Sequence, residues 1–348
     1  MTGFTRDPDG DSIGTDRASR GVLTINRRVF LTTLAAAVAS PLRASAEEPA
    51  RLHRIGMLER TSMVVNAINV DSFRRRLREL GYVDGSSVSL EYRSADGVDE
   101  RFPSLASELV ALKPDVIVTR GTPAAIAGRN ATTTIPVVIL GVGDPVGQKL
   151  VTSLAHPGGN ITGLSAAVTD VYPKRVQLLR ELVPHAARIG ALLNMSNPAL
   201  PPQWKVVELA ARSLGIEAQL LDVRRVQDLE PAFDAASALR IDALIVGLDT
   251  LTQANQRMIV ELAAKRRLPA IYASTEFVGG LVTYGVEYPE MYRRAADYVH
   301  RIFRGARPAE LPVEEPTKFE LAINLKTARA LGLTIPPSVL LRADHVIN

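Results

Sequence analysis

Residues with useful binding chemistry follow two short apolar runs in the first half of the chain. The runs, at 116–118 and 137–140, are rich in β-branched residues without polar alternation, which is typical of parallel strands buried on both faces. Gly-Thr-Pro follows the first run at 121–123, and Gly-Asp-Pro follows the second at 143–145. Ligands of open α/β sheets bind at the carboxyl ends of strands, so we expect both turns to contribute to a binding site.

The two turns favour ligand groups of opposite charge. Thr122 stands where a helix N-cap belongs and Pro123 at the first helical position, so the free N–H groups there suit a carboxylate. Plain helix capping by Thr122 is the alternative. Asp144, next to Gly143, offers a carboxylate that suits a ligand ammonium group. Together the turns predict a receptor for a zwitterion, which Asp144 would bind directly.

Comparable polar residues follow the apolar runs of the second half. They are Asn194, Asp249 and, in one loop, Ser274 and Glu276. Each residue taken alone is also typical of an ordinary turn. Their recurrence at expected strand ends makes them candidate ligand contacts.

A nucleotide-dependent enzyme of Rossmann type is an alternative, because 141–147 reads Gly-Val-Gly-Asp-Pro-Val-Gly after a strand. Asp144 would place a negative charge beside a pyrophosphate, and Pro145 removes a backbone donor, so this interpretation is disfavoured. The sequence has no GxSxG, Walker A or HExxH motif, no cysteine, and only five scattered histidines. We therefore predict no catalytic residues, no metal site and no cofactor.

The expected elements predict an α/β protein with two Rossmann-like lobes. Gly81 and Gly215 each end an amphipathic helix and precede a strand, at the same place in each half. A length of 348 residues fits two domains at roughly 100 to 200 residues each. The formal charge of +4 comes from lysines and arginines interspersed with acidic residues, so we expect no nucleic-acid partner.

The N-terminus carries the pattern of an export signal. Residues 26–31 read Asn-Arg-Arg-Val-Phe-Leu, an apolar stretch follows to Ala39, and 44–46 read Ala-Ser-Ala. We expect 1–46 to comprise a disordered extension and a twin-arginine-type signal, cleaved near Ala46 after export to the periplasm by the twin-arginine or Sec machinery. A basic amphipathic first helix is the alternative.

Several blocks, in order along the chain, resemble the ABC transporter substrate-binding protein family that includes tryptophan- and tyrosine-binding members. The blocks lie at 73–85, 91–93, 121–125, 143–146, 157–163, 270–272 and 316–328. The resemblance implies a type I periplasmic-binding-protein fold, in which crossing segments join two lobes around a ligand cleft. It places the N-terminal lobe at 52–163 plus 285–315 and the C-terminal lobe at 164–284 plus 316–348.

The resemblance also implies a function without catalysis. The protein would bind a small amino-acid-like solute, aromatic or otherwise zwitterionic or carboxylated, and deliver it to an ABC permease and its ATPase subunit. A periplasmic sensor that binds a solute for a receptor is the alternative.

Ligand contacts in the family come from strand-end loops. They are carried over here onto Thr122, Pro123, Gly143, Asp144, Asn194, Asp249, Ser274 and Glu276, with Thr61 and Ser62 in the loop after the first strand. That loop departs from the family, which commonly has a Ser-Pro-Gly type turn where this chain has Glu59-Arg60-Thr61-Ser62. Two readings of the charged Glu59-Arg60 pair stay open: it selects a different solute, or it faces solvent.

Overall fold

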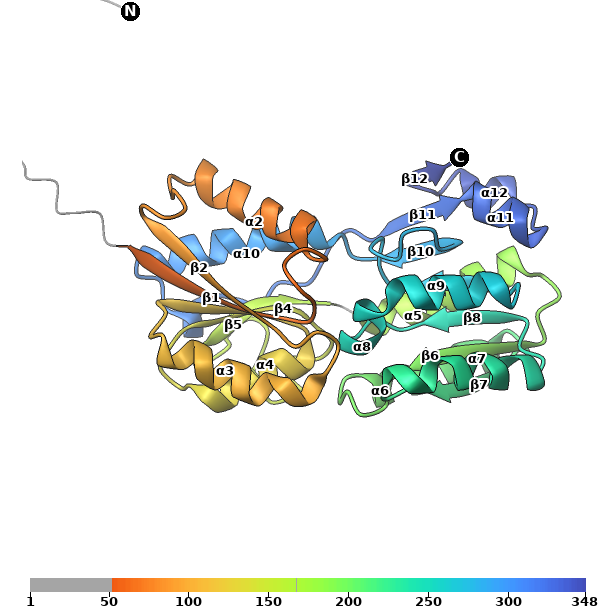
Figure 1. Cartoon of the computed structure of the whole chain (residues 1–348), viewed down its shortest axis with the longest axis horizontal. Helices are drawn as coiled ribbons and strands as arrows, with labels where there is room; N and C mark the ends of the chain where they lie inside the picture. The colour runs from red at the N-terminus through yellow and green to blue at the C-terminus, as the bar shows by residue number, and fades with distance from the viewer. Residues whose placement is uncertain (1–51, 167) are drawn as a thin grey trace, which may run out of the picture. The chain divides into compact units, whose positions relative to one another are not determined.

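A computed structural model describes residues 52–166 and 168–348 of the chain. The predicted export signal and its cleavage site lie outside the described residues. Within them the chain forms two separate sheets flanked by helices (Figure 1), as the α/β prediction with two lobes required. None of the helices in this part of the chain is long and apolar enough to span a bilayer.

The first sheet is entirely parallel, with strand order β2-β1-β3-β4-β5. Two of its three inner strands, β3 and β4, are buried at every position, which explains why their sequences lack polar alternation. Its elements are β1 (His53–Glu59), α2 (Ala67–Glu79), β2 (Val88–Ser94), η1 (Asp99–Arg101), α3 (Phe102–Ala111), β3 (Val116–Arg120), α4 (Thr122–Ala131), β4 (Val137–Val142) and β5 (Ile161–Ser165).

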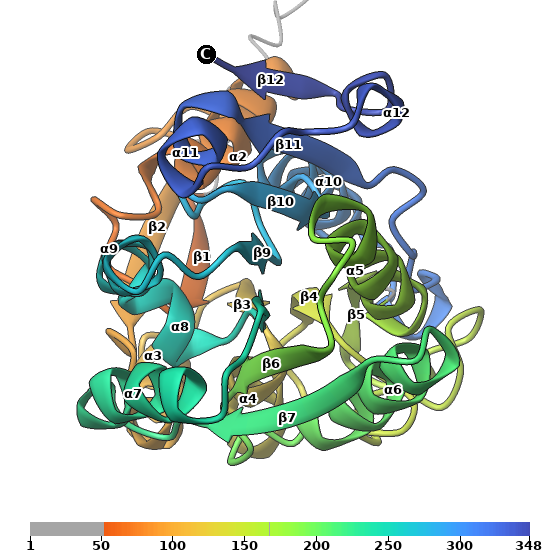
Figure 2. The ribbon, with the colours of Figure 1, turned by 90° about the vertical axis from the view of Figure 1, so that its right-hand side faces the viewer.

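The second sheet has the order β12-β11-β10-β9-β8-β6-β7 and is parallel except between β10 and β11. Figure 2 shows its strands with α5 to α9, α11 and α12 around them. The elements are α5 (Val168–Leu182), β6 (Arg188–Leu193), α6 (Leu200–Ser213), β7 (Glu217–Asp222), η2 (Val226–Asp228), α7 (Leu229–Ala238), β8 (Ala243–Val246), α8 (Thr250–Ala254), α9 (Gln256–Lys265), β9 (Ala270–Tyr272), β10 (Val282–Gly285), β11 (Glu320–Asn324), α11 (Leu325–Leu331), α12 (Pro337–Leu340) and β12 (His345–Ile347).

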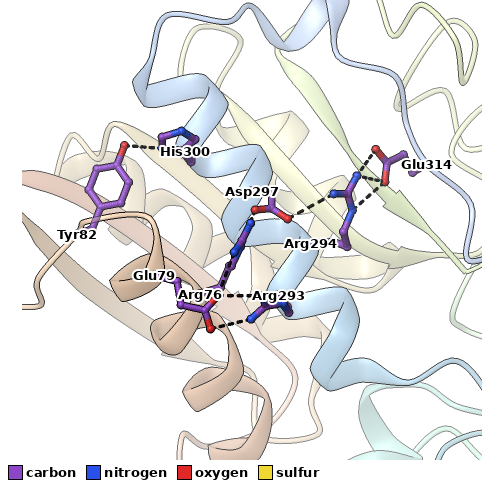
Figure 3. Close-up of polar contacts among 8 residues, drawn as sticks. All are labelled: Arg76, Glu79, Tyr82, Arg293, Arg294, Asp297, His300 and Glu314. Atoms are coloured by element: carbon purple, nitrogen blue, oxygen red, sulfur yellow. Dashed lines mark hydrogen bonds and ion pairs between the residues drawn. The ribbon is translucent and has the colours of Figure 1, made fainter.

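Helix α10 (Tyr288–Phe303) follows a strand of the second sheet but packs on the first, beside α2 and β4. Its buried face, which includes Tyr292 and Val299, shares a core with Phe73 of α2. Polar contacts border this core (Figure 3): Arg76 of α2 donates to Asp297 at 2.8 Å, and Glu79 accepts from Arg293 at 2.9 Å. Apolar burial thus joins α10 to the first sheet, and ion pairs fix its alignment with α2.

The chain passes between the two sheets after β5, after β10 and again between η3 (Pro308–Glu310) and β11. The first and last passages lie side by side, because Ser165 donates its backbone N–H to the Glu314 carbonyl and Glu314 donates to Gly163. Arg294 of α10 binds the Glu314 carboxylate at 2.6 Å (Figure 3). These contacts hold the connecting segments close to the carboxyl ends of β4 and β5.

Candidate functional site

The carboxyl ends of strands from both sheets meet around one ion pair. Arg120, the last residue of β3, is fully buried, and its Nη2 donates to Glu276 Oε2 at 2.7 Å. Glu276 follows β9 and also accepts from Asn69 of α2 at 2.6 Å and from Gln253 of α8 at 2.7 Å. The loop after β9 is therefore bonded directly to elements of the first sheet.

The charges of this pair stabilise each other. Burial disfavours the ionised carboxylate of Glu276, but the charge of Arg120 and hydrogen bonds from Arg120, Asn69 and Ser274 outweigh it and lower the pKa of Glu276. Burial likewise disfavours the Arg120 cation, yet Glu276 keeps the pKa of Arg120 well above its ordinary value. The Arg120 guanidinium also lies 4.0 Å from the Tyr288 ring centroid. Both members of the pair are therefore charged at neutral pH.

Beside the ion pair lies a cavity of about 50 Å³, which we call the Arg60 cavity. Its walls come from strand ends of the first sheet and from helices of the second. The lining includes Arg60, Thr122, Gly143, Tyr172, Arg175 and Asn197. At roughly 10 to 15 Å³ per water on this measure, the cavity has room for a few water molecules.

Arg60, which follows β1, is buried with only 3% of its surface exposed. Its Nε and Nη1 atoms are buried and have no hydrogen-bond partner among the described residues. The guanidinium lies against Gly121, where an added Cβ would come within 2.1 Å of Arg60 Nη2. A glycine at 121, with φ of 83°, therefore makes room for this cation.

Glu59, the last residue of β1, is fully buried and accepts a 2.6 Å hydrogen bond from the Tyr292 hydroxyl at Oε1. Burial is the main cause that raises the pKa of Glu59 to about 7, against opposing effects of Arg120 and Arg60. Neither member of the Glu59-Arg60 pair faces solvent. Burial therefore contradicts the interpretation that the pair faces solvent, and its selection of a different solute stays a prediction.

Thr122 and Gly143 both line the cavity, but Thr122 is not the helix N-cap that the sequence predicted. The N-cap of α4 is Gly121, and Thr122 is the first helical residue without a capping hydrogen bond. Its hydroxyl instead accepts from the backbone N–H of Gly143 at 3.4 Å, joining the two turns. Pro123 lies half-buried in the first turn of α4 and is not among the lining residues.

The structure does not support the expectation for Asp144. This residue is exposed, and its carboxylate accepts the Gly147 backbone N–H at 2.8 Å, closing its own turn. Asp144 is not among the residues that line the Arg60 cavity. An aspartate two residues after a strand can stabilise a turn as readily as it binds a ligand, and here it stabilises the turn.

Asp249 and Asn194, two candidates from the second sheet, are buried. Asp249 caps α8, with Oδ1 accepting from Thr252 N at 2.8 Å, whereas its buried Oδ2 has no partner among the described residues. Burial raises the pKa of Asp249, and a hydrogen bond from Thr252 opposes that shift. Asn194 accepts the backbone N–H of Ser196 at 3.1 Å. Asp249 is thus a carboxylate with a free acceptor position close to the cavity.

The remaining candidates separate by burial. Ser274 is buried and donates to Glu276 at 3.1 Å. Thr61 is also buried, with a hydroxyl that has no partner among the described residues. Ser62 is exposed and only accepts a 3.4 Å contact from Val65 N. Ser62 and Asp144 therefore lie apart from the buried cluster that the other polar candidates form.

Sequence reasoning did not single out Arg120 or Arg175. Arg175 of α5 is buried, lines the cavity, and donates from Nε to the Tyr284 carbonyl at 2.8 Å. Its guanidinium lies 4.7 Å from the Tyr172 ring centroid. An arginine at the end of an otherwise apolar strand, as in Val-Ile-Val-Thr-Arg, is a signal that could have identified Arg120.

Comparisons with known proteins agree with this architecture. The sequence profile of a family described as ABC transporter substrate binding protein matches residues 58–347. A tyrosine-binding protein from Clostridioides difficile (strain R20291) is 28% identical over 263 residues, which is 75% of each chain.

Two solved structures extend the likeness to three dimensions. An ABC domain in complex with L-Trp from Streptococcus pneumonia is 28% identical, with a TM-score of 0.79 over 85% of this chain and all of its own. The ligand-free, open structure of a substrate-binding protein with adhesive properties from Clostridium difficile is 25% identical and has the same coverage, with a TM-score of 0.62. By this overall measure the present chain is more similar to the tryptophan complex than to the open structure.

Proposed function

The chain belongs to the family of ABC transporter substrate-binding proteins, and from this premise we propose that it binds a small amino-acid-like solute in the Arg60 cavity. The family consists of solute-binding proteins rather than enzymes, and its generic role is delivery to a membrane permease. The relatives that are named for tyrosine or crystallised with tryptophan support an amino-acid-like solute for this chain.

One observation supports this site most strongly: buried polar groups without partners gather around the cavity. Nε and Nη1 of Arg60 belong to a residue that lines the cavity. The Thr61 hydroxyl and Asp249 Oδ2 belong to residues that directly follow the lining residues Arg60 and Leu248 along the chain. Leaving such a group unpaired costs about 1 to 3 kcal/mol, and more when it is charged. A solute that supplies the missing partners would recover part of that free energy as affinity.

A carboxylate and an ammonium group have different places near this cavity. Arg60, together with the start of α4 at Thr122, suits the carboxylate. Asp249, rather than Asp144, is the carboxylate that suits an ammonium group, because it is buried and keeps one oxygen free. Solutes as large as tryptophan need a wider cavity than about 50 Å³, so their entry requires the two sheets to move apart.

Binding is coupled to closure through contacts from both sheets. A solute that touches Arg60 on one side and Arg175 on the other would favour the closed arrangement and shift its population. The Arg120–Glu276 pair, formed between the same two sides, would stabilise that arrangement further. An ABC permease with its ATPase subunit is the proposed recipient of the solute.

We also keep three further assignments as proposals. The protein acts in the periplasm, after export by the twin-arginine or Sec route with cleavage near Ala46. The lobes are 52–163 plus 285–315 and 164–284 plus 316–348. The protein has no enzymatic activity of its own.

Native mass spectrometry of freshly purified protein tests the proposal. We expect a fraction of the protein to carry one small molecule, and the same molecule to bind the emptied protein in a 1:1 titration. A thermal-shift screen with amino acids, NAD and NADP serves as the comparison, because a ligand that binds the native state raises the unfolding temperature. Stabilisation by the dinucleotides alone would contradict the proposal.

A further inference from the structure

A second and larger cavity adjoins the Arg60 cavity. It measures about 470 Å³, and we call it the Asp99 cavity. Asp99 lines it from the first sheet, and Asn194 and Leu251 line it from the second. Asn197 and Leu248, which belong to the same two segments of the second sheet, line the Arg60 cavity. The segments that follow β6 and β8 therefore border both cavities.

The loop that carries Asp99 contacts elements of both sheets. Gly97 in this loop donates its backbone N–H to the carbonyl of Arg60, which follows β1, at 3.1 Å. A Cβ added at Gly97 would lie 2.8 Å from Cβ of Ala254 in α8. Asp249 is the N-cap of this helix. Asp99 and Asp249 thus approach each other from different sheets, close enough for the charge of Asp249 to act on Asp99.

Oxygen atoms without partners lie on both sides of this approach. They are Asp99 Oδ1, Asp249 Oδ2 and Thr250 Oγ1, which are buried and have no hydrogen-bond partner among the described residues. Asp249 and Thr250 are completely buried. In the described part of the chain no lysine or arginine nitrogen lies within 4.0 Å of either carboxylate. Buried acceptors without a donor are costly, most of all when they are charged, so a cation with several N–H donors would be stabilised here.

The nearby charges leave room for such a cation. Burial raises the pKa of Asp99 to about 6, the charge of Asp249 adds to the rise, and Arg60 opposes it. Burial also raises the pKa of Asp249, again against the charge of Arg60. Arg60 is thus shared between two carboxylates, and its charge also acts on the carboxyl of Glu59.

A count of the charged groups around both cavities shows no excess of positive charge. The three buried arginines face four carboxylates, namely Glu59, Asp99, Asp249 and Glu276. Two further arginines, Arg224 and Arg225, line the Asp99 cavity, but their side chains are 60% and 77% exposed and pair with Asp222 and Asp228. An ammonium group can therefore enter without meeting an uncompensated cation.

We infer that Asp99 is a second contact for the ammonium group of the solute, which Asp99 and Asp249 bind together from different sheets. This inference rests on the proposed function and deepens it, because that function gives the ammonium group Asp249 alone. An ammonium group has three N–H donors, as many as the unpartnered oxygens of Asp99, Asp249 and Thr250. Since one carboxylate comes from each sheet, an amine gains both contacts only in the closed arrangement, so closure selects solutes with a free amino group.

Pairs of probes with and without the amino group measure this selection. L-Tryptophan is compared with indole-3-propanoate, L-tyrosine with 3-(4-hydroxyphenyl)propanoate, and L-glutamine with 4-carbamoylbutanoate. Each pair shares its carboxylate and its side chain. Thermal shift and isothermal titration calorimetry at pH 7.5 give the affinities for the wild-type protein. We expect the amino member to bind at least about tenfold more tightly in every pair that binds.

Variants assign the selection to the two aspartates. Asp99→Asn keeps the shape of the side chain and removes its charge. It should lower the affinity for the amino member about ten- to a hundredfold and leave that for the desamino member within about threefold, so the ratio within a pair falls. Asp249→Asn should lower the ratio as well, and Asp99→Glu should recover part of it. Asp234→Asn, at a position that is 65% exposed on α7, removes the same charge as a control and should leave the ratio unchanged.

The outcomes distinguish the inference from the function beneath it. Equal losses for both members in Asp99→Asn would show that Asp99 serves only as a counter-ion of Arg60, and a gain for the desamino member alone would show a long-range effect of charge. Either result overturns the contact. A ratio that falls in Asp249→Asn but not in Asp99→Asn removes Asp99 from the site and leaves the proposed function intact. A protein that none of the six probes stabilises contradicts the proposed amino-acid-like solute as well. The unfolding temperatures of the variants, measured first, confirm that they are folded.

Discussion

At the scale of single residues, Glu59 is the group whose protonation should be visible in the stability of the protein. Its pKa rises from an ordinary value of 4.5 to about 7 because the carboxyl is fully buried. The folded protein therefore keeps a proton that the unfolded chain has already released between these two pH values. The free energy of unfolding should fall as the pH rises through this window, by on the order of 3 kcal/mol for a shift of this size.

Glu59→Gln should remove this dependence, since an amide does not titrate and can still accept from the Tyr292 hydroxyl. Urea unfolding at several pH values between 4.5 and 8 measures how the free energy of unfolding depends on pH in the variant and in the wild type. Asp99 and Asp249 also have pKa values raised mainly by burial and contribute a slope of the same sign, so the prediction concerns the difference between variant and wild type. Parallel curves for the two proteins would show that Glu59 titrates normally.

The residue scale also shows where inference from sequence fails. Six candidate site residues could be identified from the sequence because each follows a recognisable strand. They are Thr122, Gly143, Asn194, Asp249, Ser274 and Glu276. Arg120 could not be paired with Glu276 in advance, because 156 positions separate them and only the fold brings them together. Asp144 was expected to contact the ligand, but in the structure its carboxylate closes its own turn. An aspartate at this place after a strand can do either, so the sequence does not distinguish the two roles.

At the scale of elements, apolar burial rather than the exposed ion pairs should hold α2 against α10. Phe73 is fully buried in the core that these helices share, and Phe73→Ala should lower the free energy of unfolding by about 3 to 5 kcal/mol. The ion pair between Arg293 and Glu79 is partly exposed on both sides, so Arg293→Ala should lower the free energy of unfolding far less than Phe73→Ala does. Chemical denaturation of both variants gives the comparison, and a larger loss for Arg293→Ala would reverse this ranking.

Most strands and helices could be predicted from the sequence, because buried parallel strands are short apolar runs and the amphipathic helices end at glycines. The residue pattern alone did not assign the elements after α10 to a sheet, and only the family resemblance placed 316–348 in the C-terminal lobe. Strand β11 pairs antiparallel with β10, and β12 then pairs with β11. That arrangement depends on long-range pairing, which leaves no local pattern. The N-cap of α4 lies one residue before the predicted position, at Gly121 rather than Thr122.

At the scale of the whole molecule, the network around Glu276 should favour the closed arrangement of the two sheets. Its carboxylate accepts from Asn69 and Arg120 on one side and from Gln253 and Ser274 on the other. Glu276→Gln leaves Arg120 buried without its counter-ion, which is strongly destabilising for the closed state. We expect the variant to bind solute at least about tenfold more weakly.

Small-angle X-ray scattering measures the arrangement directly. The radius of gyration of Glu276→Gln without solute should exceed that of the wild type, and saturating solute should reduce the difference. Glu261→Gln, on the exposed face of α9, is the matched control and should behave as wild type. Equal radii for all three proteins would exclude Glu276 as a determinant of closure.

The central claim is that the solute binds in the Arg60 cavity, in contact with groups from both sheets. A crystal structure of the protein with its co-purified solute tests it most directly. The account predicts a carboxylate of the solute within hydrogen-bond distance of the Arg60 guanidinium, with Thr122 and Arg175 also in contact. A solute bound elsewhere, for example among the connecting segments near Glu314, or one that leaves Arg60 untouched, would contradict it.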